Sequence, residues 1–536
     1  MAGAAGCYED KGNYDYRDVN EVLVKVQKLY AVRKANLTYV IRPDIVQSVA
    51  TDTTNLKFEW WHNTGSNQQK GTLVSTADTI AIKIDPSLSN MPYRHFMRLY
   101  ITDRMTGAQY MFPVELEVVK PYEGAWMVLH QGPDGVAKLG AVTYIGENID
   151  IIDDAYFEES GQKLTGKPSK LGVAISYSGY YTVPSYRPSC LFFCFTDNPA
   201  ESGALMPESA FRLYGSPETF IYPAHRASFD IKNIVTCDGS GRARMMISGG
   251  HIFQGSLYNR SMYRVNPDPL GITGDVEITH GCCIGWTQVA FDSKGKRFIH
   301  LYSTNSAMYD DFNEPGENTA MYSSIRHSDY SLPEPDPNNL PEDEEMVYLG
   351  PGYWYGPSMM ARQSRVAAYG ITVSESRNKL CLYELHGNPL YSADNPDDAP
   401  FTFFNEVDNT FGITVGTPMA SSTAYNRVLF YGKGNKVYRL DLGTEGGRAD
   451  AIYTHPDPGA KVSLIKPARS QRNDDNEYDT LYARYGYRVD QSFAVVFEVA
   501  GEKGEVVVLN LNAAGKVTET QEGLDGFGKI TDIVFI

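Results

Sequence analysis

The feature that most constrains this chain is a strand pair that recurs across a polar turn from about residue 124 to residue 536. Clear copies occupy residues 126–139, 290–302, 370–383 and 423–431, and weaker copies lie at residues 190–195, 236–247 and 493–511. Seven copies over about 410 residues give roughly 60 residues per copy, the size of one four-stranded propeller blade with long loops. We therefore predict a seven-bladed β-propeller over residues 121–536. Two stacked sandwiches are the alternative, but they give no reason for seven turns of one type.

The last apolar segment, residues 529–535, is a further strand of this region. An unpaired strand at a sheet edge invites pairing with another chain. We expect this strand to pair with the first blade and so to close the ring.

A second rhythm precedes the propeller region, between residues 18 and 120. Six short β-rich segments alternate with turn-forming clusters there, as in an immunoglobulin-like sandwich, at residues 22–26, 37–41, 57–61, 79–84, 95–101 and 110–118. We expect Trp60 or Trp61 to be buried between the sheets and residues 103–107 to form the hairpin turn before the last strand. Pro121 and Gly124 break the pattern and mark the boundary. The predicted fold is thus all-β, with a tether at residues 1–17, a sandwich at 18–120 and the propeller at 121–536.

Composition excludes several classes of protein. The formal net charge of −17 opposes a phosphate backbone, and no Lys/Arg stripe alternates with aromatics, so we expect no nucleic-acid partner. No run approaches the roughly 18 apolar residues of a membrane span. Seven cysteines in 536 residues form no C-x-x-C pair, which argues against a disulfide scaffold and a structural zinc site. Cys282 and Cys283 are interpreted as buried small residues.

The usual catalytic signatures are missing from the sequence. It has no H-E-x-x-H, G-x-S-x-G or G-x-x-x-x-G-K-[ST] pattern, so we assign no catalytic residue. The ten histidines are scattered singly. A propeller could still bring His251, His280 and His300 to one axis as metal ligands, but ordinary surface or turn histidines are the favoured interpretation and we predict no metal site.

Two oxygen-rich loops, residues 394–398 and 473–477, are weak candidates for a structural Ca²⁺. Neither follows the D-x-[DN]-x-[DN]-G pattern, so solvated turns are favoured and no other cofactor is predicted. Glycoside hydrolysis would require two carboxylates in one cleft, and the 65 Asp and Glu residues single out no pair.

The longest interruption of the strand pattern runs from residue 302 to 361 and includes a segment rich in proline and acidic residues. Tyr353, Trp354 and Tyr355 follow it, among glycines and Pro351. Aromatic side chains on such a loop can stack on sugars or fill a partner's pocket. The alternative, a hydrophobic foot that packs the loop onto its own blade, is favoured about two to one.

The N-terminus carries small residues up to Cys7 and a polar segment after it. That order is typical of a bacterial lipoprotein, in which the cysteine thiol receives the lipid. The segment before Cys7 is shorter than a complete signal peptide, and we expect it to be the remnant of one. A frayed terminus with a chance cysteine is the alternative.

Cys7 with the polar residues 8–16, the sandwich, and the entry strand Trp-Met-Val-Leu at residues 126–129 together resemble the PKD-like family of Gram-negative surface lipoproteins. The resemblance implies a lipid on Cys7, a PKD-like domain and an outer-membrane location facing the cell exterior. It also implies partnership with a SusC/SusD-type importer, and with other surface lipoproteins, in the uptake of peptides or oligosaccharides. It implies no catalytic residue.

The leading hypothesis is therefore a non-enzymatic accessory subunit of such an importer. A surface hydrolase or lyase with its site in the propeller funnel is one alternative. A free-standing glycan-binding lipoprotein is the other.

Overall fold

The chain divides into two compact units, Met1–Pro121 and Tyr122–Ile536. This division lies one residue from the boundary expected from the sequence. The computed structural model describes residues 20–25, 29–32, 38–63, 71–83, 93–119, 122, 124–145, 148–175, 190–207, 210–221, 223–236, 239–240, 243–256, 262–264, 275–284, 287–302, 321–324, 335–354, 366–386, 401–468 and 489–536.

The described residues of the first unit form one five-stranded sheet and two strand pairs. The sheet has the order β2 (Leu29–Val32), β9 (Gln109–Val119), β8 (Tyr93–Asp103), β5 (Leu56–Asn63) and β6 (Thr72–Ser75). The pairs are β1 (Val22–Lys25) with β4 (Asp44–Gln47), and β3 (Thr38–Ile41) with β7 (Ile80–Lys83). All are antiparallel except β2 with β9.

Side chains from all three groups of strands share one hydrophobic core. Trp60 lies at its centre with 0% exposure, among Leu99 and Leu116 of the large sheet and Ile41 and Ile82 of the small pair. This confirms the expectation of a buried tryptophan in the third predicted strand. Alternating burial along β5 and β7 is the period-2 pattern of strands with one face on a core.

The turn expected before the last strand of the first unit is also confirmed. The carbonyl of Asp103 accepts from the N–H of Gly107, whose φ of 76° is in the left-handed region that glycine adopts without strain. The Asp103 carboxylate accepts from the N–H of Met105 at 2.9 Å. Strands β2, β4 and β6 were not expected from the sequence.

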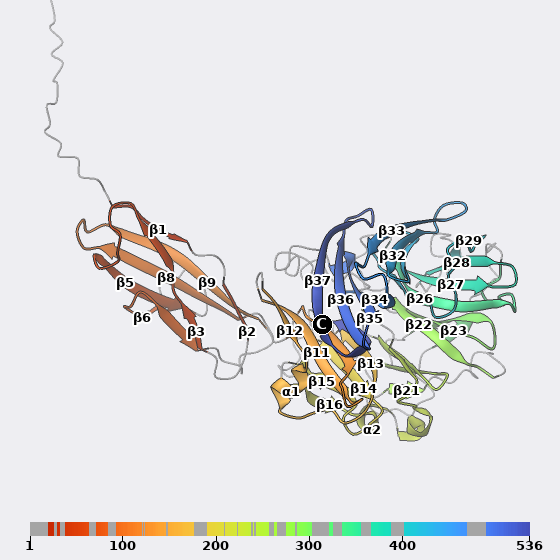
Figure 1. Cartoon of the computed structure of the whole chain (residues 1–536). Coiled ribbons are helices and arrows are strands. Elements are labelled where there is room, and N and C mark those ends of the chain that lie inside the picture. Colours follow the sequence, from red (N-terminus) through yellow and green to blue (C-terminus); the bar gives the residue numbers. More distant parts are fainter. Residues whose placement is uncertain are drawn as a thin grey trace, which may run out of the picture. The chain divides into compact units, whose positions relative to one another are not determined.

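The described residues of the second unit form seven sheets in chain order (Figure 1). Their strand orders are: first, β12 (Asn148–Ile152), β11 (Ala137–Ile145), β10 (Trp126–Gln131), β38 (Lys529–Phe535); second, β16 (Arg212–Gly215), β15 (Gly203–Met206), β14 (Cys190–Thr196), β13 (Pro168–Ile175), β18 (Gly239–Ser240); third, β17 (Ile234–Thr236), β19 (Ala243–Ser248), β20 (His251–Ser256), β21 (Met262–Arg264); fourth, β22 (Ile278–Ile284), β23 (Thr287–Asp292), β24 (Arg297–Tyr302), β25 (Met321–Ser324); fifth, β26 (Glu344–Trp354), β27 (Val366–Ser374), β28 (Lys379–His386), β29 (Phe401–Asp408); sixth, β30 (Met419–Ser421), β31 (Val428–Lys433), β32 (Lys436–Asp441), β33 (Arg448–Thr454); seventh, β34 (Lys461–Pro467), β35 (Ser492–Val499), β36 (Lys503–Leu511), β37 (Val517–Phe527).

Each of the seven predicted strand pairs falls in a different one of these sheets. One strand of each sheet, here called the inner strand, contacts the inner strand of the next sheet. The inner strands are β38, β13, β17, β22, β26, β30 and β34, and β34 in turn contacts β38. The seven sheets are therefore linked in a closed cycle.

The C-terminal strand closes this cycle as expected. β38 pairs antiparallel with β10, from Trp126 opposite Phe535 to Gln131 opposite Lys529. The imidazole of His130 secures the turn before β38, since its Nδ1 accepts from the N–H of Gly528 at 3.0 Å. An N-terminal strand and a C-terminal strand of the unit thus lie in one sheet, and their pairing joins the two ends of the unit.

Apolar side chains fill the spaces between neighbouring sheets. Trp126 and Val128 of the first sheet pack against Val496 and Phe527 of the seventh. Phe193 of the second sheet packs with Phe253 of the third. The core of this unit is thus a series of interfaces, and each interface is formed by the facing sides of two adjacent sheets.

Helices are few and short among the described residues. They are α1 (Ala155–Ser160), α2 (Pro217–Phe220), and two 3₁₀ turns, Pro223–Ser228 and Val489–Gln491. Asp154 caps α1 through the N–H of Phe157, and Gly161 ends it in the left-handed conformation. No helix in the described ranges has the length and hydropathy of a membrane span. The all-β prediction is confirmed.

Candidate functional site

The strongest cluster of chemically capable side chains in the described residues lies in the fifth sheet, around Glu344. Glu344 begins the inner strand β26 and is only 1% exposed. Its Oε2 accepts from the hydroxyl of Thr372 at 2.6 Å and from that of Tyr383 at 2.8 Å. A buried carboxylate is tolerated only when it is hydrogen-bonded and its charge is balanced, so its partners decide what it can do.

Arg377 supplies the balancing charge. It lies in the turn between β27 and β28, and its three guanidinium nitrogens reach three carboxylates. Nε contacts Asp343 at 3.0 Å, the second nitrogen contacts Glu344 at 2.9 Å, and the third contacts Glu406 of β29 at 2.7 Å. The turn holds this position because Asn378 has a φ of 50° and its N–H donates to the carbonyl of Glu375.

These contacts fix the charge states of the turn. Hydrogen bonds from Ser374, Ser376 and Arg377 hold the pKa of Asp343 well below its usual value. The hydrogen bonds to Asp343 and Glu344 raise the pKa of Arg377, despite its partial burial. Arg377 therefore stays charged and Asp343 stays ionised at any physiological pH.

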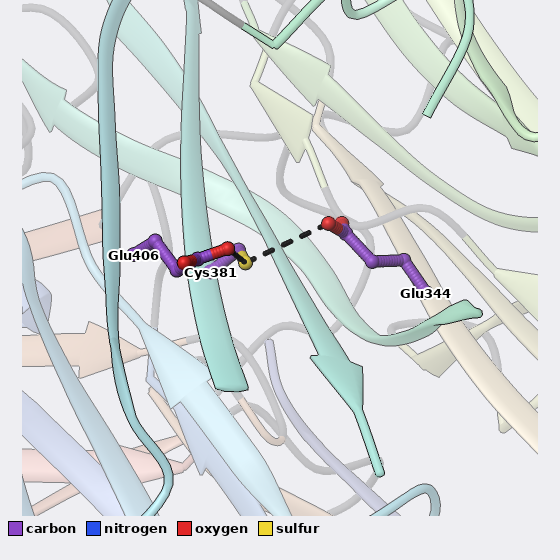
Figure 2. A group of neighbouring side chains, drawn as sticks. All are labelled: Glu344, Cys381 and Glu406. Atoms are coloured by element: carbon purple, nitrogen blue, oxygen red, sulfur yellow. Dashed lines mark hydrogen bonds between the residues drawn. The ribbon is translucent and has the colours of Figure 1, made fainter. Parts of the chain in front are cut away.

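Cys381 completes the cluster from β28, as Figure 2 shows. Its Sγ lies 3.8 Å from Oε1 of Glu344 and 3.9 Å from Oε2 of Glu406. These three side chains could in principle offer ligands to a metal, since their ligand atoms lie within 4.8 Å of one another. Burial, with the nearby Glu344 and Glu406, raises the pKa of the Cys381 thiol. The sulfur is thus a protonated thiol, a poor nucleophile and a poor metal ligand.

The cluster fits a charge-balanced internal network better than a metal centre. Both carboxylates that a cation would need already bind the guanidinium of Arg377. Burial and the neighbouring Glu344 raise the pKa of Tyr383, so that its hydroxyl remains a donor. The cluster joins all four strands of the fifth sheet at one end.

A second buried charge cluster lies on the inner strands at the point of ring closure. Asp532 of β38 is 0% exposed and receives Lys170 of β13 at 3.0 Å and Lys466 of β34 at 3.7 Å. It also accepts from the N–H of Leu171 at 3.1 Å. Burial alone would raise the pKa of Asp532, but the two lysines lower it below its usual value. One carboxylate thus links three successive inner strands.

The aromatic segment singled out in the sequence lies at the end of β26. Tyr353 is half-buried and packs against the core cluster that contains Tyr369, to whose hydroxyl its N–H donates at 3.1 Å. Trp354 is the last residue of that strand, but its side chain lies outside the described residues, as does all of Tyr355. The ligand contact predicted for these three residues stays a prediction.

The three histidines considered, but not favoured, as axial metal ligands do not occupy equivalent strands. His280 lies on the inner strand β22, whereas His251 and His300 lie on β20 and β24, third in the order of their sheets. Burial lowers the pKa of His280 to about 4, so it is neutral at neutral pH. Of the His300 side chain the structure describes nothing.

Of three other assignments made from the sequence, one falls within the described residues and two fall outside them. Cys282 and Cys283 are buried, as expected. Cys7 lies outside the described residues. The two oxygen-rich loops, residues 394–398 and 473–477, lie outside them as well.

Sequence reasoning missed the Glu344 cluster. A signal was present, because Arg377 stands in the polar turn of a predicted strand pair and Glu344 stands in an acidic run at the start of β26. The sequence did not reveal the strand register that brings that turn to the start of β26 and the end of β29.

Comparisons with known proteins bear on the first third of the chain and on the general fold. Residues 7–168 match the sequence model of the PKD-like family. The match begins at Cys7, includes the entry strand at residues 126–129, and ends at the start of β13. The match agrees with the PKD-like resemblance noted above for residues 7–168 and does not extend to the rest of the chain. No curated protein matches the sequence.

Several solved structures are similar in outline. A quinonprotein alcohol dehydrogenase-like protein from Bacteroides thetaiotaomicron shares 11% identity, with 96% of this chain and 99% of that chain covered and a TM-score of 0.41. AztD from Citrobacter koseri shares 12% identity over 82% of this chain and 96% of its own, with a TM-score of 0.32. PorZ of Porphyromonas gingivalis shares 11% over 74% and 46%, with a TM-score of 0.26. Such distant likenesses say nothing about activity.

Proposed function

We propose that this chain is a non-enzymatic lipoprotein of the outer-membrane surface, anchored through Cys7, that assists a SusC/SusD-type importer in capturing peptides or oligosaccharides. In this proposal Met1–Pro121 is a PKD-like sandwich that acts as a spacer. Tyr122–Ile536 is a seven-bladed propeller whose loops face the partner or the nutrient.

The observation that carries the proposal is the PKD-like match whose first residue is Cys7. A cysteine at the start of the matched segment is where a lipoprotein of that family would carry its lipid. Several acyl chains would hold a protein on a membrane firmly, whereas one chain binds only marginally.

Charge distribution supports the same arrangement. Met1–Pro121 contains 14 Lys and Arg against 13 Asp and Glu, so it is almost neutral. Tyr122–Ile536 contains 34 against 52, a formal charge of −18. An anionic membrane surface attracts basic segments and repels acidic ones, so the near-neutral unit is the better neighbour for it and the acidic unit is better placed away from it.

The chemistry of the described residues favours binding over catalysis. The carboxylates around Glu344 are neutralised by Arg377, and Asp532 is neutralised by two lysines. The thiols of Cys194 and Cys381 have pKa values raised by burial, which disfavours a thiolate nucleophile.

The experiment that tests the proposal has two readouts on the full-length protein expressed with a lipoprotein signal. Mass spectrometry of the N-terminal peptide reports whether Cys7 is acylated, and an affinity pull-down from detergent-solubilised outer membranes reports the partners. We expect an acylated Cys7 and stoichiometric recovery of a SusC/SusD-type pair. Cys7→Ser should be released from the membrane fraction, whereas the matched control Cys194→Ala, a buried thiol, should stay there. An unmodified Cys7, or recovery of the protein alone, contradicts the proposal.

A further inference from the structure

Two histidines that stand far apart in the sequence meet inside the first unit. His62 lies on β5 and His95 on the neighbouring antiparallel strand β8. Since His62 pairs with Met97, His95 lies two residues along on the same face of the sheet. Nε2 of His62 is 2.6 Å from Nδ1 of His95.

The ring geometry is that of a shared hydrogen bond. The ring centroids are 4.7 Å apart and the ring planes are inclined by 28°. With the two nitrogens so close, this separation places the rings edge to edge, so that an N–H of one imidazole faces the lone pair of the other. One donor and one acceptor are needed for such a bond, and each neutral imidazole offers one of each.

The pair belongs to the core side of the sheet. His95 is 3% exposed and occupies the same face as Met97 and Leu99, while His62 follows Trp60 on the core face of β5. Burial lowers the pKa of His62. Burial, and then repulsion by His62, lower the pKa of His95 to about 4.

Asp103, buried at the other end of β8, shares the face of His95 but lies eight residues away from it. The other charged groups on the surrounding strands point away from the pair. Strand alternation puts them on the outer faces of the sheets: Lys57 and Glu59 of β5, Arg98 of β8, Glu115 and Glu117 of β9, Lys83 of β7, Lys25 of β1 and Asp44 of β4. Tyr39 of β3 packs against the core with its ring. Among the described residues, burial lowers the pKa of both histidines, and His62 lowers that of His95 further.

We propose that His62 and His95 form an acid-sensitive latch, which holds β5 to β8 while the two rings share one N–H···N bond and releases them when both rings are protonated. Two imidazolium rings present only donors to each other, so the shared bond is lost. They also place two positive charges side by side in a low-dielectric core. The latch goes beyond the proposed function and does not depend on Cys7.

The sign of the pH effect follows from the pKa directions. A histidine whose pKa is lowered by folding takes up its proton more readily in the unfolded or opened chain. The stabilisation is therefore complete above the unfolded value of about 6.5. It is lost as the pH falls from there toward the folded value of His95, about 4.

The test is native-state hydrogen exchange of the full chain, read by mass spectrometry on peptides covering β5 and β8. After correction for intrinsic exchange rates, it gives the opening constant of these strands at pH 6 and at pH 5. Uptake of two protons raises that constant up to about 100-fold per pH unit, and uptake of one proton raises it up to about tenfold.

We expect the wild type to approach the two-proton slope. His62→Gln should show at most the one-proton slope, because His95 is then the one histidine of the pair that can take up a proton. The amide of the new glutamine can still bond to a neutral His95. His62→Gln/His95→Gln should lose the part of the slope that is due to the pair. His280→Gln in the second unit is the matched control, because it removes a half-buried histidine with an equally low pKa and should leave β5 and β8 unchanged.

Equal slopes for the wild type and the double variant would overturn the latch. If the double variant does not fold, the comparison of wild type with His62→Gln decides, and equal slopes there overturn it too. An acid-induced opening spread equally over the second unit also contradicts the proposal, because it would report general acid unfolding.

Discussion

Replacing Arg377 by methionine tests whether the Glu344 cluster is a charge-balanced structural network. The substitution keeps an apolar stem and removes the guanidinium that serves three carboxylates. Asp343 and Glu406 are 34% and 32% exposed, so water can stabilise their charges, and Lys379 remains 3.9 Å from Glu406. Glu344 is 1% exposed and is not stabilised by water in this way. Its unpaired charge therefore accounts for most of the destabilisation.

The size of the effect follows from the burial of each partner. Removing one partner of a fully buried ion pair costs about 3–5 kcal/mol. Arg377 is itself 38% exposed, and Thr372 and Tyr383 still donate to Glu344. We therefore expect a loss of about 2–3 kcal/mol in the free energy of unfolding of the second unit. Glu344→Gln added to Arg377→Met should recover part of that loss, because the amide keeps both hydroxyl donors without a charge.

The assay is urea unfolding followed by far-UV circular dichroism, with Arg448→Met as the control. The Arg448–Asp450 pair is 73% and 44% exposed, and exposed pairs contribute at most about 1 kcal/mol. Calcium gives a second readout, since Arg377→Met removes the guanidinium that Asp343, Glu344 and Glu406 share. Added Ca²⁺ should raise the melting temperature of this variant and leave that of the wild type unchanged. A variant as stable as Arg448→Met, or a wild type stabilised by Ca²⁺, would refute the reasoning.

Three further predictions concern ring closure and the thiols. Asp532→Asn leaves two lysines facing an uncharged amide in a buried site, so we expect the free energy of unfolding to fall by about 2–4 kcal/mol. Relative to the wild type, hydrogen exchange should accelerate more in β38 than in the outer strand β37. Equal acceleration in the two strands would contradict this. Gly528→Ala should lower the melting temperature by several degrees, because the new Cβ would lie 1.9 Å from the carbonyl oxygen of Gln131. Gly501→Ala carries the strain of a φ of 84° but its Cβ has nothing within 4 Å, so it should cost less; the reverse order would show that the turn at Gly528 relaxes freely. Iodoacetamide at pH 8 should modify the buried thiols only after denaturation, as read by peptide mass spectrometry, and modification in the folded protein would contradict their raised pKa values; these thiols are Cys194, Cys282 and Cys381.

The sequence by itself determined the features that are local along the chain. Alternation of apolar and polar residues over a strand pair and its turn is a property of some fifteen neighbouring residues, so each of the seven pairs could be located, and each lies in its own sheet. The burial of Trp60 and the turn at Asp103 follow from equally local patterns. The closing strand was foreseen because a free apolar strand at the end of the chain must find an edge to pair with.

Only the tertiary structure decided which distant polar groups meet. Arg377 reaches Glu344 and Glu406 because the register of β26, β27, β28 and β29 sets a hairpin turn beside two strand ends. His62 meets His95 because a single register joins β5 to β8, and a slip of one residue would turn one ring to the other face. Pairing registers are set by the packing of whole sheets around their cores, and no local pattern encodes them. The sites that such registers assemble therefore become visible only when the chain is folded.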